Sequence, residues 1–161
     1  PFHYIDEKGE LVGFDVAMGH ILAKGLFGDP TKVKFVDQSA DSRIANVLTG
    51  NVDITCQFMT VTPQRALQVE FTIPYYREGL GILLSKNGKY KNYEELKKAG
   101  DSVTVSMLQN TFAEQWVHKA LPAAKVEQYD SQDLTIQSVN SGRVDGAVVD
   151  ASNLRWLMQK E

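Results

Sequence analysis

The chain has very little cysteine and histidine, and this scarcity limits its possible chemistry. Cys56 is the single cysteine, so it cannot form an internal disulfide, and no metal-ligand spacing surrounds it. The histidines, His3, His20 and His118, are scattered along the chain. None has a serine, cysteine or aspartate partner at a recognisable spacing. We therefore expect no catalytic residues, no metal site and no cofactor.

Other features are also missing. No apolar run approaches the roughly 20 residues that a membrane-spanning helix needs, and no glycine-rich phosphate loop or dinucleotide motif is present. A formal net charge of -3 and a pI near 5.6 argue against nucleic acid as a partner. What remains is a chain of 161 residues, 43% hydrophobic and 23% charged, which is typical of a globular protein with one core or two small lobes.

Apolar runs alternate with helical patterns along the chain. The predicted strands cover residues 2–5, 33–36, 52–58, 80–84, 103–107, 126–129 and 144–149. The predicted helices cover residues 15–28 (with Asp15 as N-cap), 41–49, 93–99, 111–121, 133–140 and 151–159. This alternation predicts an α/β fold with mainly parallel sheets flanked by helices. The polar passage 86–91 suggests a boundary between two similar units, 1–86 and 87–161.

Polar residues follow the predicted strands at the ends where α/β sheets bind their ligands. The segment after the strand at 52–58 contains Thr60, Thr62 and Pro63 and then reaches Arg65 in a first helical turn. Hydroxyls, a helix N-terminus and a guanidinium fork favour a carboxylate. This pattern predicts a carboxylate site. The alternative is a solvated arginine that merely follows a helix-starting proline.

Two further residues occupy similar positions in the second unit. Asp150 ends an apolar run and precedes a helix, so it can cap that helix, pair with a ligand ammonium, or do both. Thr111 opens another predicted helix and can either cap it or bind the same carboxylate as Arg65. A group for the negative end of a ligand and a group for its positive end together describe a zwitterion. An α-amino acid is the obvious candidate.

A set of motifs then resembles a known family, the amino-acid-binding proteins of bacterial ABC importers (solute-binding protein family 3, type II periplasmic-binding-protein fold). Each motif alone is weak, but their order and spacing over essentially the whole chain are specific. The motifs are PF (residues 1–2), GELVGFDV (9–16), DSRI (41–44), GNVDI (50–54), TVTPQR (60–65), FTIPYY (71–76) and GRVDGAVVD (142–150).

The resemblance implies a hinge-closing, two-lobed binder that holds its ligand between the lobes. In the first lobe, Arg65 matches the arginine that binds the ligand α-carboxylate. Thr60 matches the hydroxyl, and Phe58 the backbone carbonyl, that receive the α-amino group. Phe2 lies near the aromatic wall of that lobe. In the second lobe, Thr111 matches a hydroxyl on the carboxylate. The residue matching the aspartate on the ammonium is Asp150.

Departures from the family pattern bear on ligand choice. Ala40 stands where an aromatic residue often stacks on the ligand side chain, and its absence disfavours a basic ligand. Asn110 stands where glycine is usual. Arg43 can reach an acidic ligand side chain, or it can be a structural residue at a helix start. The resulting preference is for an acidic or polar amino acid.

The resemblance also implies partners and alternatives. We expect a monomeric receptor, with a signal peptide in its precursor, that is periplasmic (or lipid-anchored outside the cell) and serves a membrane ABC permease. We also expect both chain ends to be trimmed, so that the first lobe is incomplete. One alternative is a cyclohexadienyl dehydratase-like enzyme, with Glu114 near the position of its acid, although Gln109 to Phe112 replace the dehydratase signature. The other alternative is the sensing domain of a receptor.

Overall fold

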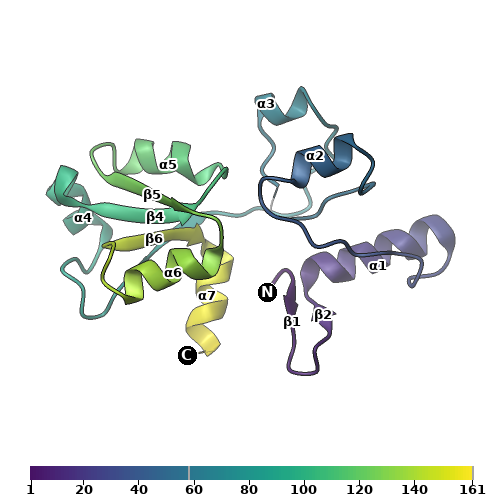
Figure 1. Ribbon diagram of the computed structural model, residues 1–161, viewed down its shortest axis with the longest axis horizontal. Helices are drawn as coiled ribbons and strands as arrows, with labels where there is room; N and C mark the ends of the chain where they lie inside the picture. The colour runs from purple at the N-terminus through teal and green to yellow at the C-terminus, as the bar shows by residue number, and fades with distance from the viewer. Residues whose placement is uncertain (58, 161) are drawn as a thin grey trace. The chain divides into compact units, whose positions relative to one another are not determined.

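The structure is a computed structural model that describes residues 1–57 and 59–160 (Figure 1). The chain divides into two compact units, Pro1–Pro74 (unit 1) and Tyr75–Glu161 (unit 2). This division differs from the predicted boundary between residues 86 and 87, because the strand at 80–84 pairs within the sheet of unit 2. As a division into functional lobes, 1–86 and 87–161 stays a prediction.

Unit 1 opens with a short antiparallel ribbon that leads into a long helix. Strand β1 (Tyr4–Ile5) pairs with β2 (Leu11–Val12), and helix α1 spans Phe14–Phe27. The rings of Phe2 and Phe14 pack edge to face with their centroids 5.5 Å apart, which attaches the ribbon to the start of the helix.

The start of α1 differs from the sequence prediction. Its N-cap is Gly13, with φ 127°, whereas Asp15 lies inside the first turn. The buried Asp15 carboxylate lies 3.0 Å from Nδ1 of His3, and its backbone N–H donates to the Phe2 carbonyl. The predicted N-cap at Asp15 is therefore wrong, because this side chain is used in a long-range contact. The predicted stop is confirmed by the left-handed Gly28, φ 74°.

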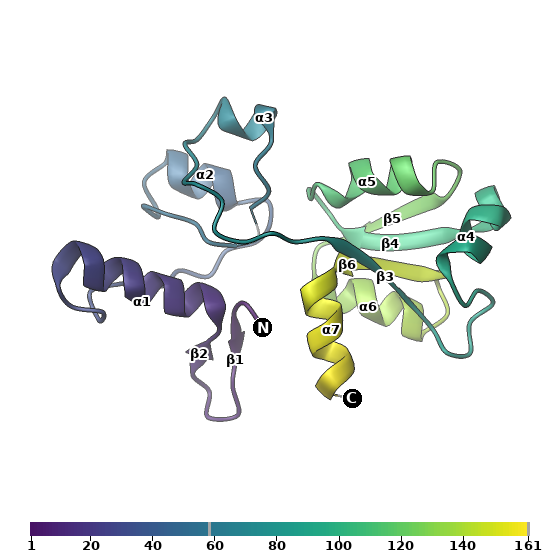
Figure 2. The same ribbon diagram turned by 180° about the vertical axis from the view of Figure 1, so that it is seen from behind.

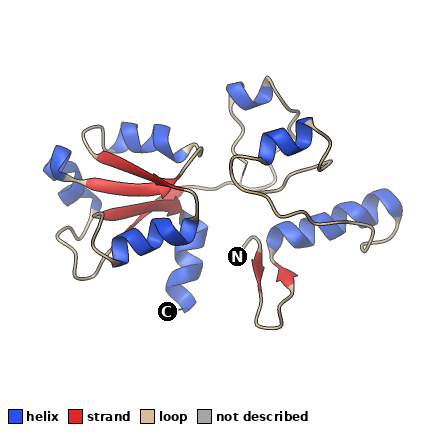
Figure 3. Cartoon of the chain, viewed as in Figure 1, coloured by secondary structure: helices blue, strands red, loops and turns tan. Residues whose placement is uncertain are grey.

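The remainder of unit 1 contains two short helices joined by loops, α2 (Arg43–Leu48) and α3 (Pro63–Ala66) (Figure 3). The strands predicted at 33–36 and 52–58 are not found in the described residues of those ranges. A strand requires a hydrogen-bonded neighbour, and no described segment of unit 1 forms a ladder with either range.

Unit 2 is built on a four-stranded mixed sheet in the order β3-β6-β4-β5. Strand β4 pairs in parallel with β5 and β6, whereas β3 runs antiparallel to β6. The strand bounds are Leu80–Leu84 (β3), Thr104–Leu108 (β4), Lys125–Tyr129 (β5) and Gly146–Asp150 (β6). The predicted α/β class with a mainly parallel sheet is confirmed in this unit. A Cβ at Gly146 in β6 would lie 2.9 Å from the Ile82 side chain, so a larger residue there would require that side chain to shift.

Helices cover both faces of this sheet, and α5 and α6 lie on opposite sides of it (Figure 2). The helical segments are α4 (Tyr93–Ala99), the 3-10 turn η1 (Gly100–Ser102), α5 (Ala113–Ala120), α6 (Gln132–Asn140) and α7 (Ala151–Lys160). The side chains of one core come mainly from β4, α4 and α5, with Val148 of β6, and those of the other mainly from β6, α6 and α7. Covering both faces explains why the central strands are apolar on both sides.

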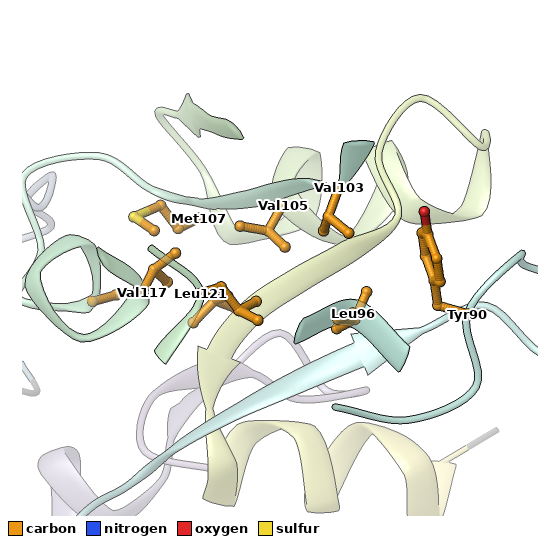
Figure 4. Packing of buried hydrophobic residues seen from close by; sticks show 9 residues of the cluster. Tyr90, Leu96, Val103, Val105, Met107, Val117 and Leu121 are labelled. Atoms are coloured by element: carbon orange, nitrogen blue, oxygen red, sulfur yellow. The ribbon is translucent and has the colours of Figure 1, made fainter. Parts of the chain in front are cut away.

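Side chains alternate along β4 and supply both faces. Val105 and Met107, together with Val103 just before the strand, are fully buried in the core that also contains Leu96 and Tyr90 (Figure 4). The alternate residue Ser106 points the other way and donates a 3.0 Å hydrogen bond to the Thr135 carbonyl of α6. Its hydroxyl also accepts from Ser138, so this buried polar group is satisfied.

Candidate functional site

In unit 1 the candidate site is built on a single helical turn, α3. Thr62 has extended dihedrals, and its buried hydroxyl accepts a 3.2 Å hydrogen bond from the Arg65 N–H. Pro63 occupies the first turn, where its missing N–H costs nothing. The threonine cap and the proline thus fix the backbone from which the Arg65 side chain extends.

The Arg65 guanidinium lies close to Thr60. Its Nη1 donates a 2.9 Å hydrogen bond to the Thr60 carbonyl. Partial burial lowers the pKa of Arg65 from its usual value, but an arginine remains charged at neutral pH. The structure therefore places two of the predicted site residues, Arg65 and Thr60, together and holds the charged Arg65 side chain against the Thr60 backbone.

Arg65 lies in the first turn of α3, as predicted, but this helix has only four residues. So short a helix contributes little to anion binding, because the macrodipole is a sum over aligned peptides. Any carboxylate selectivity at this point must come from the guanidinium itself.

Two predicted contacts for the ligand amino group involve Phe58 and Thr60. Phe58 lies outside the described residues. The Thr60 residue is exposed, and its backbone carbonyl is occupied by Arg65. The roles assigned to the Phe58 carbonyl and the Thr60 hydroxyl stay predictions.

Phe2 has a clear structural role. Its side chain is 6% exposed, and its carbonyl accepts a 2.8 Å hydrogen bond from the Asp15 N–H. Together with the ring contact to Phe14, these interactions hold the N-terminal ribbon against α1. Contact between Phe2 and a ligand stays a prediction.

Arg43 also has a structural role. Its side chain is buried, with Nε donating to the Ala40 carbonyl at 3.0 Å and Nη1 to the Gln57 carbonyl at 2.6 Å. The guanidinium thus connects the loop before α2 to the segment that precedes residue 58. These contacts support the alternative that Arg43 is a structural residue. Contact between Arg43 and a ligand side chain stays a prediction.

In unit 2, Thr111 is not a helix cap. Helix α5 begins at Ala113, and the N-cap position is Phe112 without a side-chain cap hydrogen bond. The Thr111 hydroxyl instead donates 2.8 Å to the Leu108 carbonyl, which leaves oxygen lone pairs available as acceptors. Asn110 before it has φ 54°, a left-handed conformation that asparagine tolerates better than most residues.

Thr111 and Asp150 share one edge of the sheet. Asp150 is the last residue of β6, and Thr111 follows the end of β4. These strands are parallel neighbours, with Met107 paired to Val148, so their carboxyl ends coincide as predicted. A hydroxyl and a carboxylate are thereby presented at the edge where ligands of such sheets bind.

The sequence interpretation missed Glu78. One oxygen of its carboxylate accepts a 2.8 Å hydrogen bond from the Gly79 N–H, and the other accepts from the Ser152 hydroxyl. The Gly79 carbonyl in turn accepts from the Ala151 N–H at 2.8 Å. No local motif signals this arrangement, because its partners are far apart in the sequence.

Metal-binding clusters and membrane-spanning helices are absent from the described part of the chain. Among residues 1–57 and 59–160, no three histidine, cysteine or acidic residues gather at metal-binding distance. None of the described helices combines the length and apolarity needed to cross a membrane. Of the predicted site residues, Arg65 and Thr60 lie together in unit 1, and Thr111 and Asp150 share a sheet edge in unit 2.

Comparisons with known proteins agree with these features. Residues 1–123 match the model of the family described as bacterial extracellular solute-binding proteins, family 3. The ABC transporter arginine-binding protein 1 of Escherichia coli K12 is 30% identical over 158 residues, which cover 98% of this chain and 62% of that protein.

Solved structures give the same result. The solute receptor for L-cysteine of Neisseria gonorrhoeae matches with a TM-score of 0.85 and 33% identity, over 99% of this chain and 64% of the receptor. The ancestral amino acid-binding protein AncCDT-1, a precursor of cyclohexadienyl dehydratase, matches with a TM-score of 0.82 and 36% identity, over 94% and 65% of the two chains.

The chain spans 62% of the length of the arginine-binding relative and 64% of the cysteine receptor, so it corresponds to a part of each. The relatives reported are named as binding proteins rather than enzymes. The family match covers well over half of the chain. The chain belongs to the bacterial extracellular solute-binding proteins of family 3.

Proposed function

We propose that this chain forms the ligand-binding part of an extracytoplasmic receptor that captures an amino acid and delivers it to an ABC importer. The ligand carboxylate binds Arg65 and Thr111, and its ammonium binds Asp150. The Phe58 carbonyl and the Thr60 hydroxyl complete the ammonium site. Family membership supports this proposal, since the reported relatives are named as amino-acid receptors.

The observation that carries the proposal is the geometry around Arg65. A capped turn and a 2.9 Å hydrogen bond to the Thr60 carbonyl hold a partly buried guanidinium at a defined position. A guanidinium that is already ordered loses less side-chain entropy when it binds a carboxylate in a two-point interaction. An ordered guanidinium is therefore suited to recognising the α-carboxylate, which all α-amino acids share.

The side-chain preference of the site is left to experiment. The sequence favoured an acidic or polar ligand, partly because of Arg43. The structure gives Arg43 two backbone acceptors and buries it, so the acidic part of this preference loses support. We therefore propose a screen that assumes no particular side-chain charge.

A dehydratase activity has less support. Glu114, the candidate acid, lies on the surface of α5, where its carboxylate is 3.8 Å from His118. Both side chains are about half exposed, at 47% and 56%. This exposed position lacks the enclosed surroundings in which a general acid usually acts on a substrate.

The test is a thermal-shift screen of the purified protein with each of the twenty standard L-amino acids. A ligand that binds only the native state raises the melting temperature. We expect stabilisation by at least one amino acid in the wild-type protein, and we expect Arg65→Ala to abolish it. Arg77→Ala is the matched control, because this exposed arginine lies outside the proposed site.

The results distinguish the possibilities directly. No stabilisation of the wild-type protein by any amino acid would contradict amino-acid binding. Unchanged stabilisation in the Arg65→Ala variant would contradict the carboxylate assignment alone. Turnover of prephenate or arogenate would favour the enzymatic alternative. Pull-down of a permease subunit by the ligand-loaded protein would test delivery to an importer.

A further inference from the structure

Glu78 lies at the point where the chain enters the sheet of unit 2. It precedes β3 by two residues, and Leu80 at the start of β3 is paired with Asp150 at the end of β6. The antiparallel pairing therefore brings the segment before β3 beside the residues that follow β6. Glu78 and Gly79 from one segment meet Ala151 and Ser152 from the other.

Three hydrogen bonds hold these segments. The Glu78 carboxylate accepts from the Gly79 N–H at 2.8 Å and from the Ser152 hydroxyl, and the Gly79 carbonyl accepts from the Ala151 N–H at 2.8 Å. The first interaction fixes the carboxylate against its own strand. The other two cross to the first turn of α7. We call this arrangement, made by Glu78, Gly79, Ala151 and Ser152, the strand–helix clamp.

The clamp encloses Asp150. On one side, Asp150 is paired to Leu80 in the ladder, and on the other its peptide continues directly into Ala151. The backbone on either side of Asp150 is thus tied to the segment 78–80. A carboxylate at the N-terminus of α7 is also electrostatically favourable, because the free N–H groups there carry partial positive charge.

We propose that Glu78 is a positioning residue, which holds Asp150 in the orientation that receives the ligand ammonium. This inference rests on the proposed function, since it assigns Glu78 a part in the same site. Glu78 itself does not contact the ligand. It acts by fixing the turn between β6 and α7 through Ser152 and Gly79.

Substitutions test this role in two independent measurements. Glu78→Ala removes both acceptors, whereas Glu78→Gln keeps one side-chain oxygen acceptor. Glu94→Ala is the matched control, since Glu94 is exposed on α4 of the same unit. Isothermal titration with the amino acid that gives the largest thermal shift measures affinity. The backbone amide resonances of Asp150 and Ala151 measure the clamp without any ligand.

We expect Glu78→Ala to weaken binding about tenfold, the effect of losing roughly one hydrogen bond to a charged group. Ser152→Ala should weaken binding similarly. The double variant should bind with no lower affinity than the weaker-binding of the two single variants, because both residues belong to one clamp. Glu78→Gln should recover most of the affinity. The Asp150 and Ala151 resonances should move in Glu78→Ala and stay in place in Glu94→Ala.

Several outcomes overturn the inference. Wild-type affinity in Glu78→Ala, or unmoved Asp150 and Ala151 resonances, would exclude a positioning role. Fully additive losses in the double variant would show that Glu78 and Ser152 act separately. If the wild-type protein binds no amino acid, the proposed function fails with this role. If the wild-type protein binds and Glu78→Ala binds equally well, only the inference about Glu78 fails.

Discussion

Two arginines of unit 1 show how the same side chain serves different purposes. Arg43 is buried and donates to the carbonyls of Ala40 and Gln57, which lie in separate loops. Arg65 is only partly buried and makes a contact within its own segment, to Thr60. The contacts of Arg43 connect loops, whereas Arg65 is the arginine proposed to bind the ligand carboxylate. Sequence spacing alone could not separate these roles, because burial depends on distant residues.

Met107 is the residue whose removal should most directly test the core of unit 2. Its side chain is fully buried, so Met107→Ala leaves a cavity and should lower the free energy of unfolding by about 2–5 kcal/mol. Met158→Ala is the matched control: this methionine is 72% exposed, and its replacement should change stability by less than about 0.5 kcal/mol. Urea denaturation of both variants measures the difference. Equal stabilities would contradict the packing described.

Thr62 should affect the function of Arg65 without contacting the ligand itself. Thr62→Ala removes the N-cap, at a cost of about 1 kcal/mol to the local turn, and should reduce the ligand-induced thermal shift. Thr62→Ser keeps the hydroxyl and should retain the shift. A full shift in Thr62→Ala would mean that the Arg65 turn is held by other contacts.

Among the elements, the junction of the N-terminal ribbon with α1 depends on Gly13. Its φ is 127°, and a Cβ there would lie 2.4 Å from the Phe2 carbonyl oxygen. An L-residue is therefore excluded by conformation and by space together.

Gly13→Ala should detach the ribbon from α1 and destabilise this junction by more than about 1 kcal/mol. Gly25→Ala, in the same helix but with open space around the added methyl, should instead stabilise by about 0.5–1 kcal/mol. Hydrogen exchange of the Asp15 amide, which donates to the Phe2 carbonyl, reports on the junction. Slow exchange of this amide in Gly13→Ala would contradict the expectation.

The accuracy of the sequence predictions differs between the elements of the two units. The strand at 80–84 and the helix at 93–99 are found at their predicted bounds, because each has a strong local pattern and a partner in the sheet or core. The strands predicted at 33–36 and 52–58 have more mixed sequences and no ladder partner in the described part of unit 1. A strand is stabilised by its neighbours, which a local pattern does not contain.

The same limit applies to the site. The sheet edge beside Asp150 follows from strand order, and the sequence predicted it correctly. The direction of β3 and the contact between Glu78 and Ser152 depend on long-range pairing, and no local spacing indicated either. The hydroxyl of Thr111 was expected at a helix start, but the helix begins two residues later, at Ala113.

For the whole molecule, the proposed zwitterion site needs residues from both units. Asp150→Asn removes the carboxylate charge proposed to pair with the ligand ammonium. It should weaken amino-acid binding about 10–100-fold, which corresponds to the loss of one hydrogen bond between charged groups. Asp133→Asn, an exposed aspartate on α6, is the matched control. Isothermal titration measures both. If Arg65→Ala abolishes binding and Asp150→Asn does not change it, Asp150 does not receive the ligand ammonium.

The antiparallel direction of β3 also has a mechanical consequence. The linker from unit 1 enters β3 at the edge where β6 ends and α7 begins. Tension between the chain before β3 and α7 would therefore pull on neighbouring ends of two antiparallel strands. It would open the strand–helix clamp first and then the ladder hydrogen bonds one after another, starting at Leu80 and Asp150. Such unzipping needs much less force than shearing a whole ladder at once. Under load, the residue proposed to receive the ligand ammonium would be the first of its strand to separate.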